Sequence, residues 1–174
     1  MLFTERSIWT MVHGIGLGGG ALMALTAALF YLFAARTSPA PSPSASRALA
    51  AITAFAAAMV WLTVLVGTNI IFPPYRATPP AGAVDLSQFP RSLIQANADT
   101  AWLHAFAMES KEHMPWIASM LATAAAFVVV RYRSAAVADA SLRTMAIILL
   151  AVCVALVGFV SLMGVFVNKV APLQ

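Results

Sequence analysis

The sequence contains little charge and almost no cysteine. Only 9% of its 174 residues are charged and 61% are hydrophobic, whereas about 25% of residues are charged in soluble globular proteins. This composition excludes an ordinary soluble domain. The single cysteine, Cys153, excludes both a disulfide within the chain and a CxxCH attachment site for c-type haem. We expect Cys153 to be a small packing residue.

The common catalytic signatures are missing as well. The chain has no P-loop, no HExxH motif and no Ser/His/Asp set at a plausible spacing. Gly14, Gly16 and Gly19 match the GxGxxG pattern of dinucleotide-binding loops, but that pattern requires a preceding strand and an acidic residue about 20 positions later. Neither is present. We therefore expect a non-catalytic or electron-transfer subunit rather than an enzyme.

Long apolar runs, in contrast, are abundant. Four runs, at about 7–35, 48–72, 112–131 and 142–168, each approach or exceed the ~20 residues that cross a bilayer as a helix. They do not alternate as barrel strands do, and helices are the other way to satisfy the backbone in lipid. The sequence predicts an all-α integral membrane four-helix bundle, a single membrane domain over 1–174. The first run is too long for a signal peptide and is predicted to be a retained helix.

The loop predicted at 73–111 is the only sizeable segment outside the membrane. It begins with the proline cluster FPPYRATPP, and its second half, DTAWLHAFAMESKEHMPW, has apolar residues at helical spacing. Pro115 can stand in the first turn of a new helix or bend a continuing one. The sequence thus allows a short extramembrane helix in this second loop that leads into the third span, or one bent helix.

Charge predicts the orientation in the membrane. The two short loops carry the arginines 36, 47, 131, 133 and 143 against one acid, Asp139. Short loops rich in arginine stay cytoplasmic. We expect a multi-pass protein of the plasma (inner) membrane with both termini and the long loop outside, in the periplasm. The formal charge of +4 is thus a membrane feature, and no nucleic-acid partner is expected.

One layer of polar residues is predicted near the outer boundary. At about 1.5 Å of rise per residue, a count from the arginine-rich ends puts one polar residue of each span at a similar depth: His13, Asn69, His113 and Asn168. His104 lies on the same side, so this side holds all three histidines of the chain.

The histidines have acidic neighbours. If residues 104–113 are helical, His104 shares a face with Glu112, and Glu109 pairs with His113. Three imidazoles and two carboxylates can form a metal site or provide axial ligands for haem, with the carboxylates fixing the ring tautomers. Plainer interpretations stay open, because headgroup water can satisfy the histidines and the charged residues can form a solvated turn.

The glycines beside His13 favour haem over a simple helix contact. Five of the seven positions 14–20 are glycine, and the pairs Gly14/Gly18 and Gly16/Gly20 let another helix approach closely. A haem between helices needs the same bare surface and, in addition, a histidine at its edge. We predict His13 and His113 as the ligand pair, His104 as a substitute ligand, and Gly16 and Gly20 as a cofactor wall.

This arrangement is similar in architecture to membrane cytochrome b subunits, whose four-helix bundles carry bis-histidine haem. The similarity implies a small subunit of a hetero-oligomeric redox or respiratory complex in the lipid bilayer. Such a subunit exchanges electrons with a periplasmic cytochrome or a quinol. Three basic side chains on the same side are candidates for pairing with haem propionates: Arg91, Lys111 and Lys169.

Two other classes of function are compatible with the sequence. One is a metal-binding membrane protein that uses the three histidines with Glu109 and Glu112; copper is the candidate metal, because the thioethers of Met11, Met108 and Met114 favour copper(I). The other is a purely structural accessory subunit whose glycine face packs against a larger membrane complex.

Overall fold

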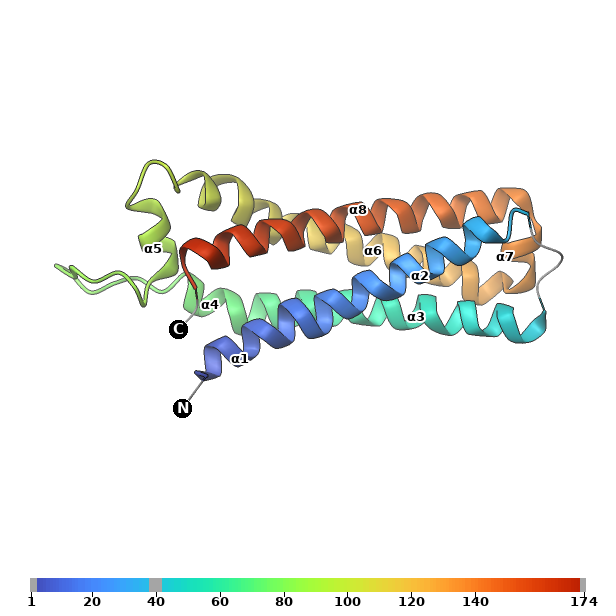
Figure 1. The fold of residues 1–174 in the computed structure, drawn as a ribbon, viewed down its shortest axis with the longest axis horizontal. Coiled ribbons are helices and arrows are strands. Elements are labelled where there is room, and N and C mark those ends of the chain that lie inside the picture. Colours follow the sequence, from blue (N-terminus) through green and yellow to red (C-terminus); the bar gives the residue numbers. More distant parts are fainter. Residues whose placement is uncertain (1–2, 38–41, 173–174) are drawn as a thin grey trace.

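Four long helices run side by side along the longest axis of the molecule (Figure 1). The computed structural model describes residues 3–37 and 42–172, and this part of the chain contains no strand. The helices long and apolar enough to span a membrane are Glu5–Ala34, Pro43–Tyr75, Leu103–Tyr132 and Ala140–Val170. The all-α bundle is thus confirmed, and the four helices fit a multi-pass membrane protein.

Each span is built from labelled elements, in which η denotes a π-helical segment. The first span contains α1 (Glu5–Met11), η1 (Val12–Gly19) and α2 (Gly20–Ala34). The second contains α3 (Pro43–Val66), η2 (Gly67–Ile71) and α4 (Phe72–Tyr75). The long loop holds α5 (Pro90–Gln95), and the third span contains η3 (Leu103–Met108) and α6 (Glu109–Tyr132). The short α7 (Ser134–Ala138) precedes the fourth span, α8 (Ala140–Val170).

Side-chain caps define where three of the spans begin. Thr4, Ser42 and Asp139 each accept a hydrogen bond from a backbone N–H of the first turn, at 3.2, 3.2 and 2.8 Å. These N–H groups have no partner within the helix, so such caps stabilise the helix start by about 1 kcal/mol each. Pro43 directly follows its cap, where its missing N–H costs no helical hydrogen bond.

The third span begins at Leu103, nine residues before the predicted start near 112. Leu103, Ala107 and Met108 are buried against Tyr75, Met163 and Val167, so this stretch packs as part of the bundle. Pro115 lies inside α6, which corresponds to the continuous-helix alternative. Because proline has no N–H, the carbonyl of Lys111 lacks its usual helical donor. The long loop also has a short helix, α5, but it lies before the stretch for which a separate helix was predicted.

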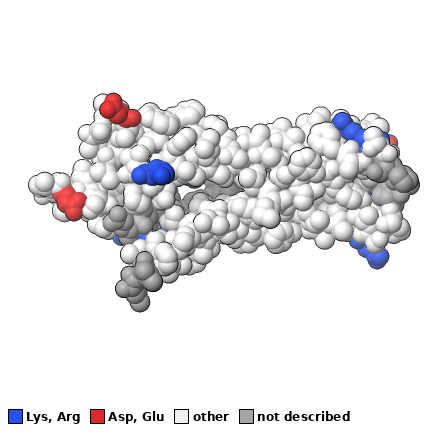
Figure 2. Space-filling model, viewed as in Figure 1, with Lys and Arg blue, Asp and Glu red and all other residues white. Residues whose placement is uncertain are grey.

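Both termini lie at the same end of the bundle as the long loop (Figure 1). We call this the terminal end, and the opposite end, with the loop after α2 and the turn at α7, the short-loop end. In Figure 2 the basic and acidic side chains lie near these two ends, and the surface between them is uncharged on the face shown. This distribution is expected for a bundle surrounded by lipid.

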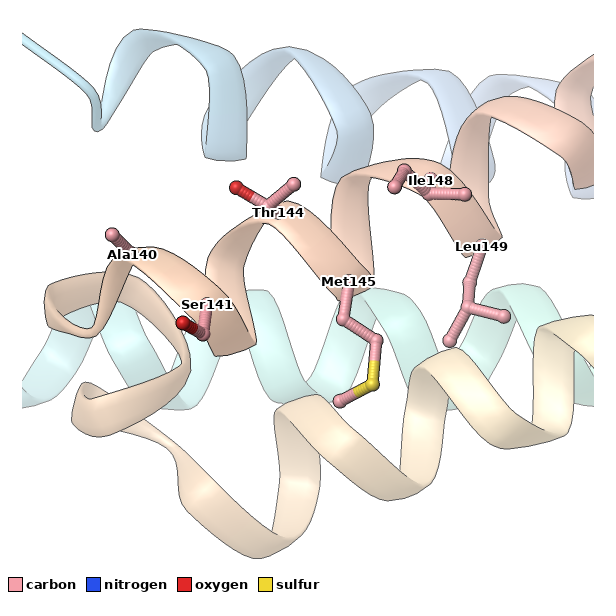
Figure 3. A pocket seen from close by; sticks show the side chains of 6 residues that line it. All are labelled: Ala140, Ser141, Thr144, Met145, Ile148 and Leu149. Atoms are coloured by element: carbon pink, nitrogen blue, oxygen red, sulfur yellow. The ribbon is translucent and has the colours of Figure 1, made fainter.

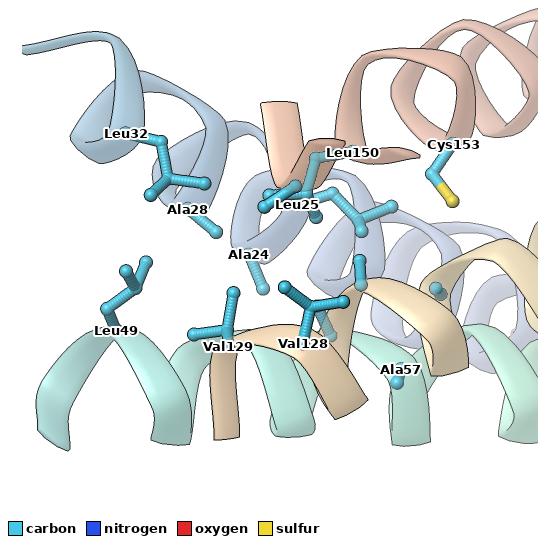
Figure 4. Packing of buried hydrophobic residues seen from close by; sticks show 14 of the residues in the cluster. Ala24, Leu25, Ala28, Leu32, Leu49, Ala57, Val128, Val129, Leu150 and Cys153 are labelled. Carbon is cyan, nitrogen blue, oxygen red and sulfur yellow. The ribbon is translucent and has the colours of Figure 1, made fainter. Parts of the chain in front are cut away.

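The main core fills the middle of the bundle and its short-loop half. It is built from alanines and branched aliphatic residues of all four spans (Figure 4). Leu25, Leu32 and Leu150 are fully buried, and alanines such as Ala28 and Ala122 face them. Small residues let helices approach closely, so that van der Waals packing can hold a bundle together in lipid.

Two polar contacts join the spans within this region. The indole N–H of Trp61 in α3 donates to the hydroxyl of Thr123 in α6 at 3.0 Å, and Trp61 also packs edge-on against Trp116. The Cys153 thiol donates to the Ala118 carbonyl at 3.4 Å. Cys153 is fully buried, as expected for a packing residue.

Candidate functional site

Three of the four spans change from α-helical to π-helical geometry in their terminal half. The segments are η1, η2 and η3, and two of them contain predicted site residues, His13 in η1 and His104 in η3. π-Helical segments are rare and occur frequently at functional sites. The terminal half of the bundle is therefore the candidate site.

His13 points into the bundle and packs on the backbone of η2. A Cβ atom at Gly67 would lie 2.7 Å from Cε1 of the His13 ring, so only glycine at position 67 leaves room for this imidazole. The ring interacts with the backbone of Thr63. Its Nδ1 atom is buried and has no hydrogen-bond partner among the described residues. Buried side-chain nitrogens without a hydrogen-bond partner are rare in folded proteins.

His104 is held by a tyrosine of the second span. The Tyr75 hydroxyl lies 3.1 Å from His104 Nδ1, and the two ring centroids are 6.1 Å apart. Tyr75 is buried in a small second core under the long loop. The charges of Arg91, Glu109 and Glu112 act on both rings. His104 therefore belongs to a polar group at the terminal end, with one ring nitrogen already bonded.

His113 faces away from the bundle. It is exposed, and its Nδ1 lies 2.8 Å from the backbone carbonyl of Glu109, one helical turn earlier. Since a carbonyl only accepts, Nδ1 carries the proton, and in the neutral ring Nε2 carries the lone pair. The predicted ligand pair therefore does not face across the interior, because His13 points inward and His113 points outward.

The other members of the predicted polar layer also point outward. Asn69 and Asn168 are exposed, and the amide of Asn69 donates to the Leu65 carbonyl at 2.8 Å. Within the described part of the chain, no three His, Cys, Asp or Glu side chains lie close enough together to hold a metal. Glu109 is exposed and Glu112 is half-buried. The structure thus gathers neither a four-residue layer nor the predicted histidine and carboxylate set.

The two glycines of the predicted cofactor wall have different surroundings. A Cβ at Gly16 would have no atom within 4 Å, whereas a Cβ at Gly20 would lie 2.8 Å from the Met59 methyl group of α3. Gly20 is thus a contact between the first and second spans. Gly16, like Gly14, faces open space and remains available to a cofactor or to another helix.

Lys111 was expected in the long loop and instead lies within the bundle. Its Nζ atom is 2.8 Å from the position that a Cβ at Gly164 of α8 would occupy. The electrostatic influence of its ammonium group reaches the His13 ring. The helix that contains the third predicted span begins earlier than that span, at Leu103, so Lys111 lies on the helix rather than in the loop. The apolar helical spacing of 103–108 was the signal that the span begins earlier.

The structure has two surface cavities that are lined by neither His13 nor Lys111. One, of about 550 Å³, is formed along the first turns of α8 by residues such as Thr144, Met145 and Ile148 (Figure 3). It lies at the short-loop end and has no charged side chain in its lining. The other, of about 280 Å³, lies between α1 and the η2–α4 segment and is lined by Glu5, Arg6 and Trp9 among others.

Comparison with known protein families, curated proteins and solved structures gives no significant match. The function is therefore inferred from the residues of the terminal half. The four spanning helices define an integral membrane bundle, and the His13 ring, whose buried Nδ1 has no hydrogen-bond partner among the described residues, is a distinctive interior group.

Proposed function

We propose that this chain is a small subunit of a membrane redox complex and that His13 is a ligand for a redox cofactor, b-type haem, in the terminal half of the bundle. The unpartnered Nδ1 of His13 is the observation that carries this proposal. A buried nitrogen without a hydrogen bond costs free energy. Coordination to iron would satisfy it, because the neutral imidazole is a common metal ligand.

The surroundings of His13 support this role. The His13 ring lies in the space that the missing side chain of Gly67 leaves. The open surface at Gly14 and Gly16 lies in η1, the same π-helical segment as His13. Haem supplies one-electron transfer when bound, and the protein contributes orientation and environment. Because His113 faces away from the bundle, the second axial ligand would be a side chain of a neighbouring subunit.

The proposal also includes the orientation in the membrane. Arginines at the short-loop end keep that end in the cytoplasm, so His13 lies near the outer face of the plasma membrane. A cofactor at this depth can exchange electrons with a periplasmic cytochrome or with a quinol in the bilayer.

A visible spectrum tests the haem proposal. The full-length protein is purified from membranes as wild type, His13→Ala, His104→Ala and His113→Ala, and reduced-minus-oxidised difference spectra are recorded. We expect b-type bands in the wild type, their loss in His13→Ala and their retention in His104→Ala, because Tyr75 already binds that ring. A wild-type preparation without b-type bands and without extractable haem contradicts the proposal.

The exposed glycines support a second candidate, a purely structural subunit. Gly14 and Gly16 face open space, and a helix of a partner subunit can pack closely on such a surface. In that case Gly16→Leu abolishes co-purification with the partner while His13→Ala leaves it intact. Co-purification that survives Gly16→Leu rejects this candidate.

A further inference from the structure

Lys111 crosses from the third span to the fourth inside the terminal half of the bundle. In α8, Gly164 has no side chain, and the Lys111 ammonium occupies the space where a Cβ would otherwise lie, with Nζ 2.8 Å and Cε 3.6 Å from that position. The side chain is partly buried. The absence of a side chain at Gly164 thus leaves the space that the Lys111 ammonium group occupies.

No carboxylate compensates the charge of Lys111. The structure gives its Nζ no ion pair and no hydrogen bond within residues 3–37 and 42–172. One turn away on the same helix, the positions facing it hold Ala107, Met108, Met114 and Pro115. Glu109 and Glu112 are two residues before and one residue after it, and side chains at those spacings do not face each other on a helix.

His13 cannot neutralise the charge of Lys111 either. The electrostatic influence of Lys111 reaches the His13 ring, but a histidine is neutral or positive. An uncompensated ammonium in a membrane helix is costly, and such residues usually mark a binding site or an ion path. An unpaired ammonium group that faces no acid on its own helix favours an anionic ligand.

The depth of these residues suits a group at the membrane boundary. His13, Gly67, Lys111 and Gly164 each lie about 9 to 12 Å, at 1.5 Å of rise per residue, from the terminal end of their span. Figure 2 shows that the surface is hollowed between α8 and the first span in this half of the molecule. An amphiphile in the bilayer, with its polar head near the membrane boundary, can therefore reach the depth of these residues from the side of the bundle.

We propose that Lys111 binds one oxyanion group, a carboxylate or a phosphate, carried by a membrane amphiphile. The ammonium of Lys111 is the donor, and Gly164 fixes its position. The phosphate of an anionic phospholipid and the carboxylate of an apolar acid or cofactor are the two sources of this chemistry. The inference rests on Lys111 and Gly164 and does not require that His13 binds haem.

Thermal unfolding of the full-length protein in neutral detergent tests the proposal. Tryptophan fluorescence follows the midpoint while dioleoylphosphatidylglycerol, oleate or, as a neutral control, dioleoylphosphatidylcholine is added. We expect an anionic amphiphile to raise the midpoint of the wild type and the neutral lipid to have no such effect. The larger shift, with phosphatidylglycerol or with oleate, identifies phosphate or carboxylate as the preferred group.

Two matched pairs of variants locate the site. Lys111→Met is expected to weaken anion binding about tenfold or more, whereas Lys169→Met, which removes an exposed lysine at the same end of the bundle, retains it. Gly164→Ala keeps the charge of Lys111 but displaces its ammonium group, so it is also expected to weaken binding. Gly158→Ala is its control on the same helix, because a Cβ there meets no atom within 4 Å.

The outcomes are separable from those of the haem experiment. Lys111→Met removes an unpaired charge and is expected to fold; should it not, Gly164→Ala provides the same comparison. Equal midpoint shifts in the wild type, Lys111→Met and Gly164→Ala overturn the proposal, as does the absence of a shift with both anionic amphiphiles. Loss of anion binding in Lys111→Met supports it whether or not the preparation contains haem.

Discussion

The two halves of the bundle use small residues for different purposes. In the short-loop half, alanines of four regular α-helices pack against leucines, and the buried polar side chains Ser46 and Thr53 are small hydroxyls. In the terminal half, three spans become π-helical, and two glycines lie against ionisable side chains. Gly67 makes room for His13, and Gly164 makes room for Lys111.

This difference indicates where the structural and the functional constraints lie. Alanine brings two helices together, and the resulting contact needs no further group. A glycine that receives the side chain of an ionisable residue keeps that residue inside a lipid-facing bundle, where it is costly. The short-loop half is thus built as a packed core, and our two proposals place binding at His13 and Lys111 in the terminal half.

The largest effect is expected in the short-loop half. Leu150→Ala removes a fully buried side chain from the main core, which costs about 2 to 5 kcal/mol of unfolding free energy at a closely packed site. Reversible unfolding in mixed micelles measures this cost. Ile148→Ala, at a side chain that is 57% exposed, is the control and should change stability little. Equal costs for the two variants would mean that this half is not closely packed.

The next effect distinguishes the two kinds of glycine. Gly67→Ala places a methyl group 2.7 Å from the His13 ring, and we expect a loss of about 1 to 3 kcal/mol from overpacking and a change in the imidazole NMR signals. Gly16→Ala meets no atom within 4 Å and should be neutral or stabilising by up to about 1 kcal/mol. If Gly67→Ala is tolerated equally well, His13 does not occupy this position.

A smaller effect is expected for the hydrogen bond between Tyr75 and His104 under the long loop. Tyr75→Phe removes the hydroxyl that lies 3.1 Å from His104 Nδ1, and the loss of one hydrogen bond costs about 0.5 to 1.5 kcal/mol. We expect the nitrogen NMR shifts of His104 to change while those of His113 stay the same. Unchanged His104 shifts would show that this hydrogen bond does not form.

The smallest effect is expected for the contact between α3 and α6. A double-mutant cycle with Trp61→Phe and Thr123→Val removes the 3.0 Å hydrogen bond, and the coupling energy should be about 0.6 kcal/mol, the average for such bonds between membrane helices. Unfolding of the four proteins in the cycle gives this energy. A coupling of several kcal/mol would place an essential polar contact in the half that we regard as a packed core.

The sequence predicts the bundle well because hydropathy and length determine a membrane span almost alone. The start of the third span is different. Lys111, Glu109 and Glu112 resemble a solvated loop, and the decision to extend the helix to Leu103 depends on packing against Tyr75 and Val167. For this reason sequence reasoning placed Lys111 outside the membrane and missed its contact with Gly164.

The predicted arrangement of the histidines depended on helical geometry that the sequence does not reveal. Assigning faces to residues 104–113 assumed α-helical spacing, but Leu103–Met108 is π-helical, with hydrogen bonds to the fifth rather than the fourth residue. The faces of His104 and His113 are therefore not related as expected. His13 stays a predicted candidate, and the sequence could not show that its ring lies against Gly67 rather than facing His113.

Haem content measured on two variants tests the central claim, that the terminal half binds the cofactor and the core only supports it. Haem is extracted from equal amounts of purified wild type, His13→Ala and Cys153→Ala, the last a core substitution in the main cluster. The account predicts haem in the wild type and in Cys153→Ala and none in His13→Ala. Haem that persists in His13→Ala, or is absent from the wild type, contradicts it.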